Sequence, residues 1–424
     1  MPEVPRPEVP RPEVMVDGRR LQDRLLELAA LGAIDGGGVC RLALTDEDRA
    51  ARDLVVSWMH DLGMRVTVDV IGNVVATWGG DHSALAPVMC GSHIDTVRTG
   101  GKYDGNYGVL SGLEVVETLA TAGIVPSRPL SVAFFTDEEG ARFPPDMLGS
   151  LVYAGGLSVE EALETRDTDG VPLGDELVRI GYAGSTPCPG MTPHAFVEVH
   201  IEQGPVLERE GITIGAVESV QGISWQEITI TGQSNHAGTT PMHMRHDAGY
   251  AAARIAVAVR EIAAGIGPPQ VGTVGSLRLS PDLTNVVASR AVLTVDLRHT
   301  DERCLRLAEQ ELAAEIDRIA AAEGLTIATR PTARFEPVQF DPRIVECIER
   351  TAIARGYSVR RIPSGAGHDA QMLARVCPTG MVFVPSAGGL SHNVAEHTDL
   401  ADLEAGANVL LHVMLELANG GVIT

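Results

Sequence analysis

The chain has 424 residues, more than one hydrophobic core usually supports, so its length predicts two domains. Its 33 basic and 56 acidic side chains give a net charge of −23, which argues against a nucleic-acid or anionic-membrane partner. Six cysteines lack any Cys-x-x-Cys pair, no signal peptide opens the chain, and no apolar run reaches about 18 residues, so we expect a cytoplasmic protein with free thiols.

The chain opens with a proline-rich repeat, PEVPR PEVPR PEV, over residues 2–14. Proline disfavours helix and sheet and favours an extended, solvated conformation, so we predict a disordered leader over residues 1–18. A proline-rich recognition peptide is the functional alternative.

Helical and strand patterns alternate after the leader. Helices are expected at 21–31, 45–62 and 109–122, and strands at 65–78, with a turn at Gly72-Asn73, and at 87–90 and 129–136. The run at 129–136 is continuously apolar, which is typical of a central parallel strand. Strands that alternate with helices predict an α/β fold built on a mostly parallel sheet.

The stretch at 89–108, MCGSHIDTVRTGGKYDGNYG, places polar residues directly after the strand predicted at 87–90. A strand that ends in a polar loop is where an open α/β sheet positions its ligands, and the glycines let His93 and Asp104 point at one place. Imidazole that binds a metal usually donates its other N–H to a carboxylate, and Asp95 is placed to accept it. The stretch is a candidate metal site, and a turn with a satisfied hydrogen bond is the alternative.

Three later apolar runs also end in candidate ligands. The run at 129–136 exits into Asp137-Glu138-Glu139-Gly140, where one carboxylate could bind an ion while its neighbour stays free as a base; an acidic helix start is the alternative. The run at 195–204 ends in His200 and Gln203, and the run at 380–385 leads to His392. A set of N and O ligands without thiolate suits two divalent ions that share one carboxylate. The candidate ligands are His93, Asp104, Glu139, His200 and His392.

Between these runs lies a segment with the pattern β-α-β-β-α-β, a ferredoxin-like unit complete in itself. We therefore expect an inserted domain at 215–334 within a catalytic domain formed by 19–214 and 335–424. Its strands are expected at 215–230, 271–279, 291–298 and 325–330, and its helices at 246–262 and 301–322. In this insert, His236, Asn285 and Arg298 stand at loops or strand ends. The ordinary interpretation of Arg298 is a surface ion pair. The alternative is that its guanidinium binds a substrate carboxylate through two parallel hydrogen bonds.

Seven ordered motifs resemble one branch of the dinuclear-metal aminoacylase and carboxypeptidase superfamily, the M20 superfamily. The motifs are GSHIDTVRTGGKYDGNYG, TDEEGARF, HIEQGPVLE, SNHAGTTPM, TVDLRHT, SGAGHDAQ and GGLSHN. The branch contains N-carbamoyl-L-amino-acid hydrolases, β-ureidopropionases and allantoate amidohydrolases, the hydantoinase/carbamoylase type of amidase. The resemblance covers residues 20–420 and leaves out only the proline-rich leader.

The resemblance implies a role for each matching residue. His93 and His200 would bind one metal and Glu139 and His392 the other, with Asp104 bridging the two. Glu138 matches the general base and Asp95 the partner of His93. Positions that hold substrate are matched by Gln203, His236, Asn285, Arg298 and Gly367, with His236 reaching in from the other subunit of a homodimer through the inserted dimerisation and lid domain. A carboxylate is common at the position of His200 in related peptidases, so His200 followed by Gln203 favours the ureido-cleaving branch.

The activity that the resemblance implies is hydrolysis of the carbamoyl C–N bond of N-carbamoyl-L-amino acids, which gives the amino acid, carbon dioxide and ammonia. It would use two divalent ions per subunit, Zn or Mn, Co or Ni. Allantoate amidohydrolase and β-ureidopropionase are the alternatives; an aminoacylase or metallopeptidase, or a non-catalytic scaffold, is less favoured. The stretch GARFPPDMLGS resembles the N-carbamoyl-L-amino-acid subgroup more than the allantoate one.

Overall fold

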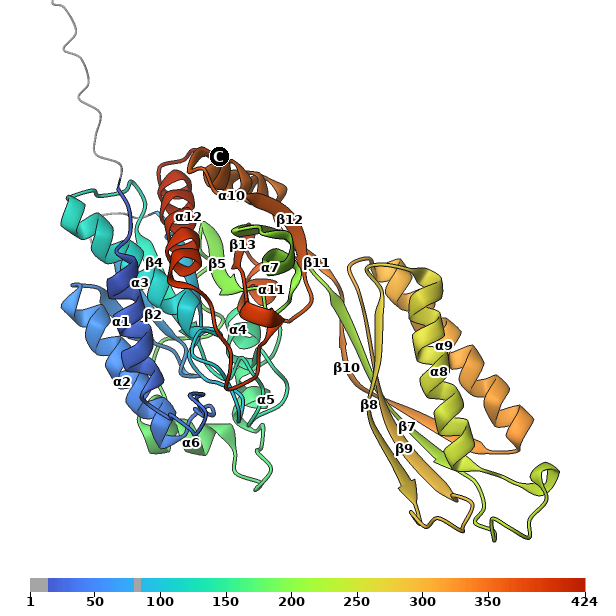
Figure 1. The fold of residues 1–424 in the computed structure, drawn as a ribbon. Coiled ribbons are helices and arrows are strands. Elements are labelled where there is room, and N and C mark those ends of the chain that lie inside the picture. The colour runs from blue at the N-terminus through green and yellow to red at the C-terminus, as the bar shows by residue number, and fades with distance from the viewer. Residues whose placement is uncertain (1–13, 80–84, 424) are drawn as a thin grey trace, which may run out of the picture. The chain divides into compact units, whose positions relative to one another are not determined.

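The structure is a computed structural model that describes residues 14–79 and 85–423 (Figure 1). The repeat predicted to be disordered therefore lies outside the described residues, except for its last position. The predicted leader ends too late at residue 18, because Val16 is buried and the Asp17 side chain caps the first helix by accepting from the backbone of Arg19 and Arg20. The chain divides into two compact units. Unit 1 comprises Met1–Glu218, Phe340–Ile362 and His368–Thr424, and unit 2 comprises Ser219–Gln339 and Pro363–Gly367, where the sequence predicted an insert at 215–334.

A mixed sheet, most of which lies in unit 1, has the strand order β1-β2-β4-β3-β5-β13-β6-β11, and β12 also pairs with β6. Its strands are β1 (Arg65–Val68), β2 (Val74–Trp78), β3 (Val88–His93), β4 (Leu130–Phe135), β5 (Ala195–Ile201), β6 (Ile214–Val220), β11 (Val338–Gln339), β12 (Val359–Ser364) and β13 (Thr379–Val384). By the bounds above, β11 and the last residues of β6 and β12 are counted with unit 2. The prediction of a mostly parallel sheet holds only for its middle, where β4, β3, β5 and β13 run parallel. The flanking pairs β1–β2, β2–β4, β13–β6 and β11–β6 are antiparallel.

The four parallel strands are buried along their whole length, which explains their continuous apolar sequences. Helices pack around the sheet (Figure 1), among them α1, α3 and α12, which contact one another, and α10, which contacts α12. The helices of unit 1 are α1 (Gly18–Ala29), α2 (Asp46–Asp61), α3 (Asn106–Ala122), α4 (Leu148–Tyr153), α5 (Val159–Leu163), α6 (Leu173–Ile180), α7 (Val206–Glu210), α10 (Pro342–Ala354), α11 (Asp369–Leu373), η2 (Ala387–Gly389) and α12 (Leu400–Ala418). No helix in the described part of the chain is long and apolar enough to cross a membrane, and the six cysteines are free thiols.

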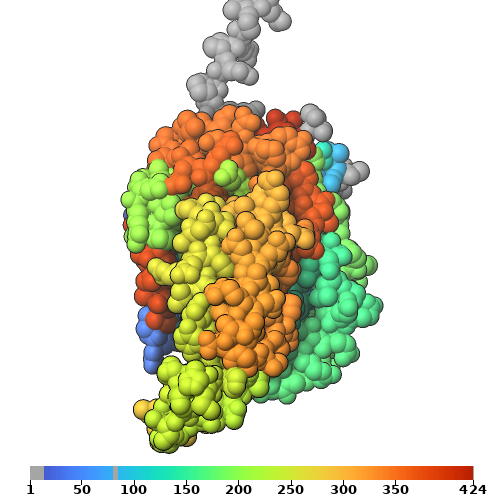
Figure 2. Space-filling model, turned by 90° about the vertical axis from the view of Figure 1, so that its right-hand side faces the viewer, coloured from blue at the N-terminus to red at the C-terminus, as the bar shows by residue number. Residues whose placement is uncertain are grey.

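Unit 2 has the element order β7-α8-β8-β9-α9-β10, which is the order that the sequence predicted. These elements are β7 (Gly222–Thr231), α8 (Ala248–Ile266), β8 (Val271–Ser280), β9 (Arg290–His299), α9 (Glu302–Glu323) and β10 (Thr326–Phe335), with a short turn η1 (Met242–Met244). Its strands form an antiparallel sheet in the order β10-β7-β9-β8. One face of this sheet packs an apolar core against α8 and α9, the helices at the front of Figure 2.

The strand predicted at 215–230 is in fact two strands, β6 and β7. They belong to different sheets, since β6 pairs with β13 and β11 whereas β7 pairs with β9 and β10. Gln221 lies at the break, and its backbone N–H donates to the carbonyl of Ser364. A period-two apolar pattern cannot indicate such a change of sheet, because both strands show the same pattern.

Candidate metal centre

The carboxyl ends of the four parallel strands lie at one edge of the sheet, and they carry the predicted ligands of unit 1. His93 ends β3, and His200 lies near the end of β5. Nδ1 of His93 is 2.9 Å from the carbonyl oxygen of Asp95, and Nδ1 of His200 is 2.9 Å from that of Ile201. Because each Nδ1–H donates to a carbonyl, Nε2 is the ring nitrogen that remains for a metal in both residues.

Asp104 lies between two groups of ligands. Its Oδ1 is 3.1 Å from Nε2 of His200 and 3.5 Å from Nε2 of His93. Its Oδ2 is 3.5 Å from Nε2 of His392, which in turn is 3.2 Å from Oε2 of Glu139. The five predicted ligands therefore meet in two clusters that share Asp104, each with ligand atoms within 4.8 Å of one another.

The electrostatics of these clusters fit a bound cation. Burial alone lowers the pKa of His93, but the carboxylates of Glu138 and Asp104 outweigh it and raise that pKa well above its ordinary value. Burial likewise disfavours the charged form of Asp104, but His200 and His93 hold its pKa well below the usual range. The pKa of His392 is raised to about 9, chiefly by its contact with Glu139. Imidazoles surrounded by buried carboxylates, without thiolate, are a donor set for divalent ions such as zinc.

The ligand loops hold strained or crowded backbone. Gly105 has φ +64°, and a Cβ atom there would lie 2.4 Å from the ring of His93, so only glycine fits between β3 and α3. Gln203 and His392 have positive φ values of 57° and 53° without being glycine. Such strain persists when surrounding contacts fix it, and it is frequent at functional sites.

Glu138 lies beside the cluster of His93, His200 and Asp104, with Oε2 3.4 Å from Nε2 of His93. It is buried, which raises its pKa well above the ordinary value against the opposing charge of His93. The predicted contact between the Asp95 carboxylate and His93 is wrong in its detail, because the backbone carbonyl of Asp95 is the hydrogen-bond partner and Oδ1 is 3.9 Å away. The Asp95 carboxylate instead accepts from the backbone N–H groups of Glu138 and Glu139, each at 3.3 Å.

Gln203 contacts the shared carboxylate itself. Its Nε2 donates to Oδ2 of Asp104 at 2.9 Å and to Oγ of Ser391 at 3.2 Å. The Ser391 hydroxyl also donates to Oδ2 of Asp104, at 3.0 Å. Oε1 of Gln203 is buried and accepts no hydrogen bond in the described part of the chain.

Two buried side chains that the sequence analysis did not single out hold the ligand loops. Glu396 accepts from the backbone N–H of Tyr103 at 2.9 Å and of Asp104 at 3.2 Å, which ties the His392 loop to the Asp104 loop. Arg41 is fully buried and donates to the carbonyl of Ile94 and to Oδ1 of Asn106. Ile94 follows His93 directly, and Asn106 is two positions after Asp104. The carboxylate four residues after His392 was a usable signal for Glu396, whereas nothing in the sequence distinguishes Arg41.

The remaining predicted residues belong to unit 2 and fall into two places within it. The backbone N–H of Ala237 donates to the carbonyl of Asn285 at 2.9 Å, and His236 pairs with Val286, so His236 and Asn285 are neighbours. Asn285 precedes the start of β9, whereas Arg298 lies near the end of this strand. There Nη1 of Arg298 donates to the carbonyl of Gly365 at 2.7 Å, and Gly365 belongs to the same segment as Gly367.

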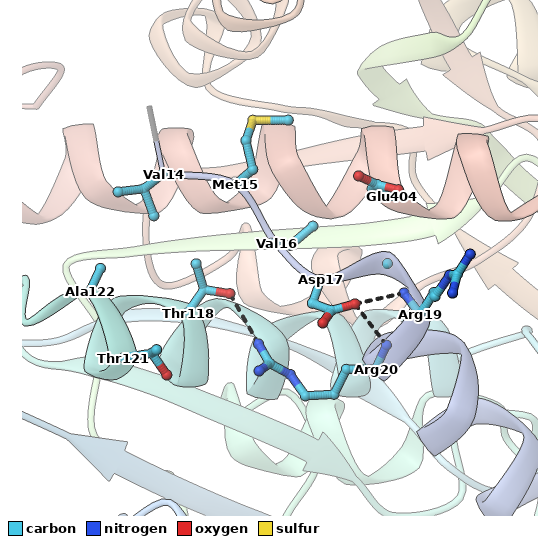
Figure 3. Close-up of a pocket in the computed structure, with 11 residues that line it drawn as sticks. Val14, Met15, Val16, Asp17, Arg19, Arg20, Thr118, Thr121, Ala122 and Glu404 are labelled. Carbon is cyan, nitrogen blue, oxygen red and sulfur yellow. Dashed lines mark hydrogen bonds between the residues drawn. The ribbon is translucent and has the colours of Figure 1, made fainter. Parts of the chain in front are cut away.

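A pocket of about 660 Å³ lies elsewhere in unit 1, where the start of α1 meets α3 and α12 (Figure 3). Asp17, Arg20, Thr118 and Glu404 contribute to its lining. None of the predicted site residues lines this pocket, so it is separate from the metal centre.

Comparisons with known proteins agree with this geometry. The family model for peptidase family M20/M25/M40 matches residues 89–416. An N-carbamoyl-L-amino-acid amidohydrolase from Rhizobium meliloti is 44% identical over 95% of this chain and 97% of its own length, and an allantoate amidohydrolase from Bacillus subtilis is 36% identical over 94% and 97%. The crystal structure of an amidase of the hydantoinase/carbamoylase family from Burkholderia multivorans covers 97% of this chain and 100% of its own, with a TM-score of 0.93 and 48% identity. The chain therefore belongs to the peptidase family M20/M25/M40 and to its hydantoinase/carbamoylase group.

Proposed function

We propose that the protein hydrolyses the carbamoyl C–N bond of N-carbamoyl-L-amino acids with two divalent ions, Zn or Mn, Co or Ni. The observation that carries the proposal is the position of Asp104, whose two oxygens face two separate ligand clusters. His93 and His200 would hold one ion, Glu139 and His392 the other, and Asp104 both. Such ions, when bound, polarise the carbonyl and lower the pKa of water to roughly 7.

Glu138 is the general base of the proposed reaction. It carries no ligand role in either cluster, yet its Oε2 lies 3.4 Å from Nε2 of His93, so it is within reach of a water at the centre. Glu138 would accept the proton of the attacking water and return it to the leaving amino-acid nitrogen. The C–N bond breaks, and the carbamate that leaves decomposes to carbon dioxide and ammonia.

Gln203 supports a ureido group as the substrate rather than a simple acyl group. Its amide nitrogen is engaged by Asp104 and Ser391, so the carbonyl Oε1 is left as a buried acceptor without a partner among the described residues. A carbamoyl group ends in an NH₂ that can donate to this oxygen, whereas an acetyl group ends in a methyl that cannot. Allantoate and N-carbamoyl-β-alanine also carry a ureido group. Allantoate remains the alternative substrate, because allantoate amidohydrolases are among the relatives.

Arg298, Asn285 and His236 would complete the site, the first two on the substrate carboxylate and His236 on the developing oxyanion. Within one chain they are not together. Arg298 lies eight positions after Arg290 on β9, about 26 Å at strand spacing, and Asn285 precedes Arg290. A site that uses all three needs two chains. His236 is expected to come from the partner subunit. We propose that Asn285 comes from the partner subunit as well.

The surface of unit 2 supports a homodimer. β8 is an edge strand of the four-stranded sheet, with a row of backbone groups open to pairing. Several of its apolar side chains, and one in the loop that follows, are exposed: Val271, Leu277, Leu279 and Leu283. Exposed apolar residues along an unpaired edge are typical of an interface between chains.

A substrate panel on metal-depleted and reconstituted protein tests the proposed activity. Chelation is expected to abolish hydrolysis, and each of Zn, Mn, Co and Ni is then added back separately. N-carbamoyl-L-amino acids should be cleaved faster than allantoate and N-carbamoyl-β-alanine, and N-acetyl amino acids and dipeptides should be the poorest substrates. Fastest cleavage of an acetyl or peptide bond, or no metal-dependent hydrolysis of any ureido compound, would contradict the proposal.

A further inference from the structure

We infer that Asp296 is a positioning residue for substrate recognition, which fixes the Arg298 guanidinium so that one edge of it is presented to the substrate carboxylate. The inference rests on the proposed role of Arg298. Both residues lie on β9, two positions apart, so their side chains are on the same face of the sheet. The register places Trp225 of β7 directly opposite Asp296.

Asp296 binds a single edge of the guanidinium. Nε of Arg298 lies 3.1 and 3.0 Å from the two carboxylate oxygens, and Nη2 lies 2.9 Å from Oδ2. Nη1 donates to the carbonyl of Gly365 at 2.7 Å. Arginine has five N–H donors, so these contacts leave one N–H on Nη1 and one on Nη2. Two N–H groups on adjacent terminal nitrogens are the pair that grips a carboxylate with two parallel hydrogen bonds.

Two further contacts fix the plane of the guanidinium. Its central carbon lies 5.9 Å from the ring centre of Trp225, a distance compatible with a cation–π contact. The second is the Gly365 carbonyl, which accepts from Nη1 of Arg298 and belongs to the segment Pro363–Gly367 of unit 2. This segment is itself held in place, because the backbone N–H of Gln221 donates to the carbonyl of Ser364. Arg298 is thus held by a carboxylate on one edge, a carbonyl on one terminal nitrogen and an indole beside it.

In the alternative role, the Asp296 carboxylate competes with the substrate carboxylate for the Arg298 guanidinium, and substrate binding displaces Asp296. That role predicts that loss of the Asp296 charge makes substrate bind more tightly. The geometry favours positioning, because Asp296 is on the Nε edge and leaves a terminal donor pair free. The side chains of Arg298 and Asp296 are 22% and 30% exposed, so solvent screens their attraction and the orientation of the guanidinium matters more than its charge balance.

The experiment compares N-carbamoyl-L-methionine with N-carbamoyl-L-methioninamide, which lacks the carboxylate, on the metal-loaded dimer. We expect Asp296→Asn to raise KM for the carboxylate substrate about tenfold with kcat within about twofold, since tenfold is about 1.4 kcal/mol, the size of one charge-assisted hydrogen bond. The preference for the carboxylate over the amide, as a ratio of kcat/KM, should fall by the same factor. Asp296→Glu keeps a carboxylate on that edge and should recover part of the preference.

Glu227→Gln is the matched control, because Glu227 forms a similar exposed contact with Arg330 at 3.1 Å on the neighbouring strands. It should leave the preference unchanged. The inference is overturned if Asp296→Asn lowers KM, or if it leaves the preference intact while Arg298→Lys reduces it. If Arg298→Lys also leaves the preference intact, the carboxylate role proposed for Arg298 fails as well. Should Asp296→Asn not fold, as judged by its thermal midpoint, the preference of Asp296→Glu must still fall below that of the wild type for the inference to stand.

Discussion

Oδ1 of Asp104 lies 3.1 Å from Nε2 of His200, while Oδ2 of the same carboxylate faces the loop that carries His392. If the two oxygens serve two ions, an amide at this position cannot replace them, because its nitrogen offers no lone pair to a cation. We expect Asp104→Asn to lose more than half of the bound metal after dialysis and to lose activity by about 10²-fold or more. Elemental analysis and the rate on the best N-carbamoyl substrate measure both effects.

Asp61→Asn is the control for this experiment. Asp61 is the exposed last residue of α2, so its change should alter neither metal content nor rate. A full complement of two ions per chain in Asp104→Asn would contradict a shared carboxylate.

Glu138→Gln tests the proposed general base apart from the proposed metal ligands. The amide has the same shape but cannot accept the proton of the attacking water, so turnover should fall by about 10²–10⁴-fold while metal content stays unchanged. The measurement is kcat together with the bound-metal ratio. An unaltered kcat in the metal-loaded variant would remove Glu138 from the mechanism.

Asp95→Ala tests whether the Asp95 side chain supports the cluster with Glu139 or the cluster with His93. Its carbonyl orients His93, and this contact survives any side-chain change, whereas its carboxylate holds the backbone N–H groups of Glu138 and Glu139. Asp95→Ala should therefore weaken the affinity of the ion at Glu139 more than that of the ion at His93. Stepwise metal titration followed by calorimetry separates the two, and equal weakening at both sites would contradict the assignment.

The convergence of the proposed metal ligands was predictable from the sequence because a simple rule brings such residues together. Parallel strands have their carboxyl ends at one edge of a sheet, so polar residues that follow apolar runs converge there, as His93, His200 and Glu139 do. The role of the Asp95 side chain was not predictable, because backbone and side-chain oxygens of one residue compete for the same imidazole N–H. Only the path of the loop decides between them.

The supports behind the ligands were also beyond the reach of the sequence. Arg41 is separated by about 50 positions from Ile94, whose carbonyl it binds, and no periodic pattern links the two. The sequence did not predict the break between β6 and β7 at Gln221 for a related reason. Long-range pairing, and not local propensity, decides where the chain passes from one sheet to another. Long-range polar contacts of this kind are known only once the fold is known.

A buried ion pair in α2 provides a stability test near the site. Asp48 and Arg52 are both fully buried and lie 2.7 Å apart, and Arg52 also donates to the carbonyl of Gly72. Asp48→Ala leaves the guanidinium without its charge partner, so we expect the free energy of unfolding to fall by about 3–5 kcal/mol. Urea unfolding measures this change.

The same helix supplies the control. Arg49 and Asp53 have the same i,i+4 spacing, but their side chains are 55% and 60% exposed and 3.9 Å apart. Arg49→Ala should change stability by less than about 1 kcal/mol. Equal losses in Asp48→Ala and Arg49→Ala would show that burial does not set the cost.

Mixed dimers test whether the substrate residues come from two chains. In unit 2, His236 and Asn285 are neighbours while Arg298 lies near the far end of β9, so His236 and Asn285 should serve the partner's site and Arg298 the site of its own chain. Equal mixing of inactive His236→Ala and Arg298→Ala protein should restore about a quarter of wild-type activity, since half of the dimers are hybrids and each has one intact site. Asn285→Ala mixed with Arg298→Ala should behave in the same way.

The pair His236→Ala and Asn285→Ala provides the decisive contrast. If both residues reach the same partner site, each site of that hybrid lacks one of them, and no activity returns. Exchange of subunits is verified by native mass spectrometry of differently tagged chains, so that a lack of recovery cannot be ascribed to a lack of mixing. Recovery in the pair His236→Ala and Asn285→Ala would place the two residues in different sites, and no recovery in either pair with Arg298→Ala would refute a site shared between subunits.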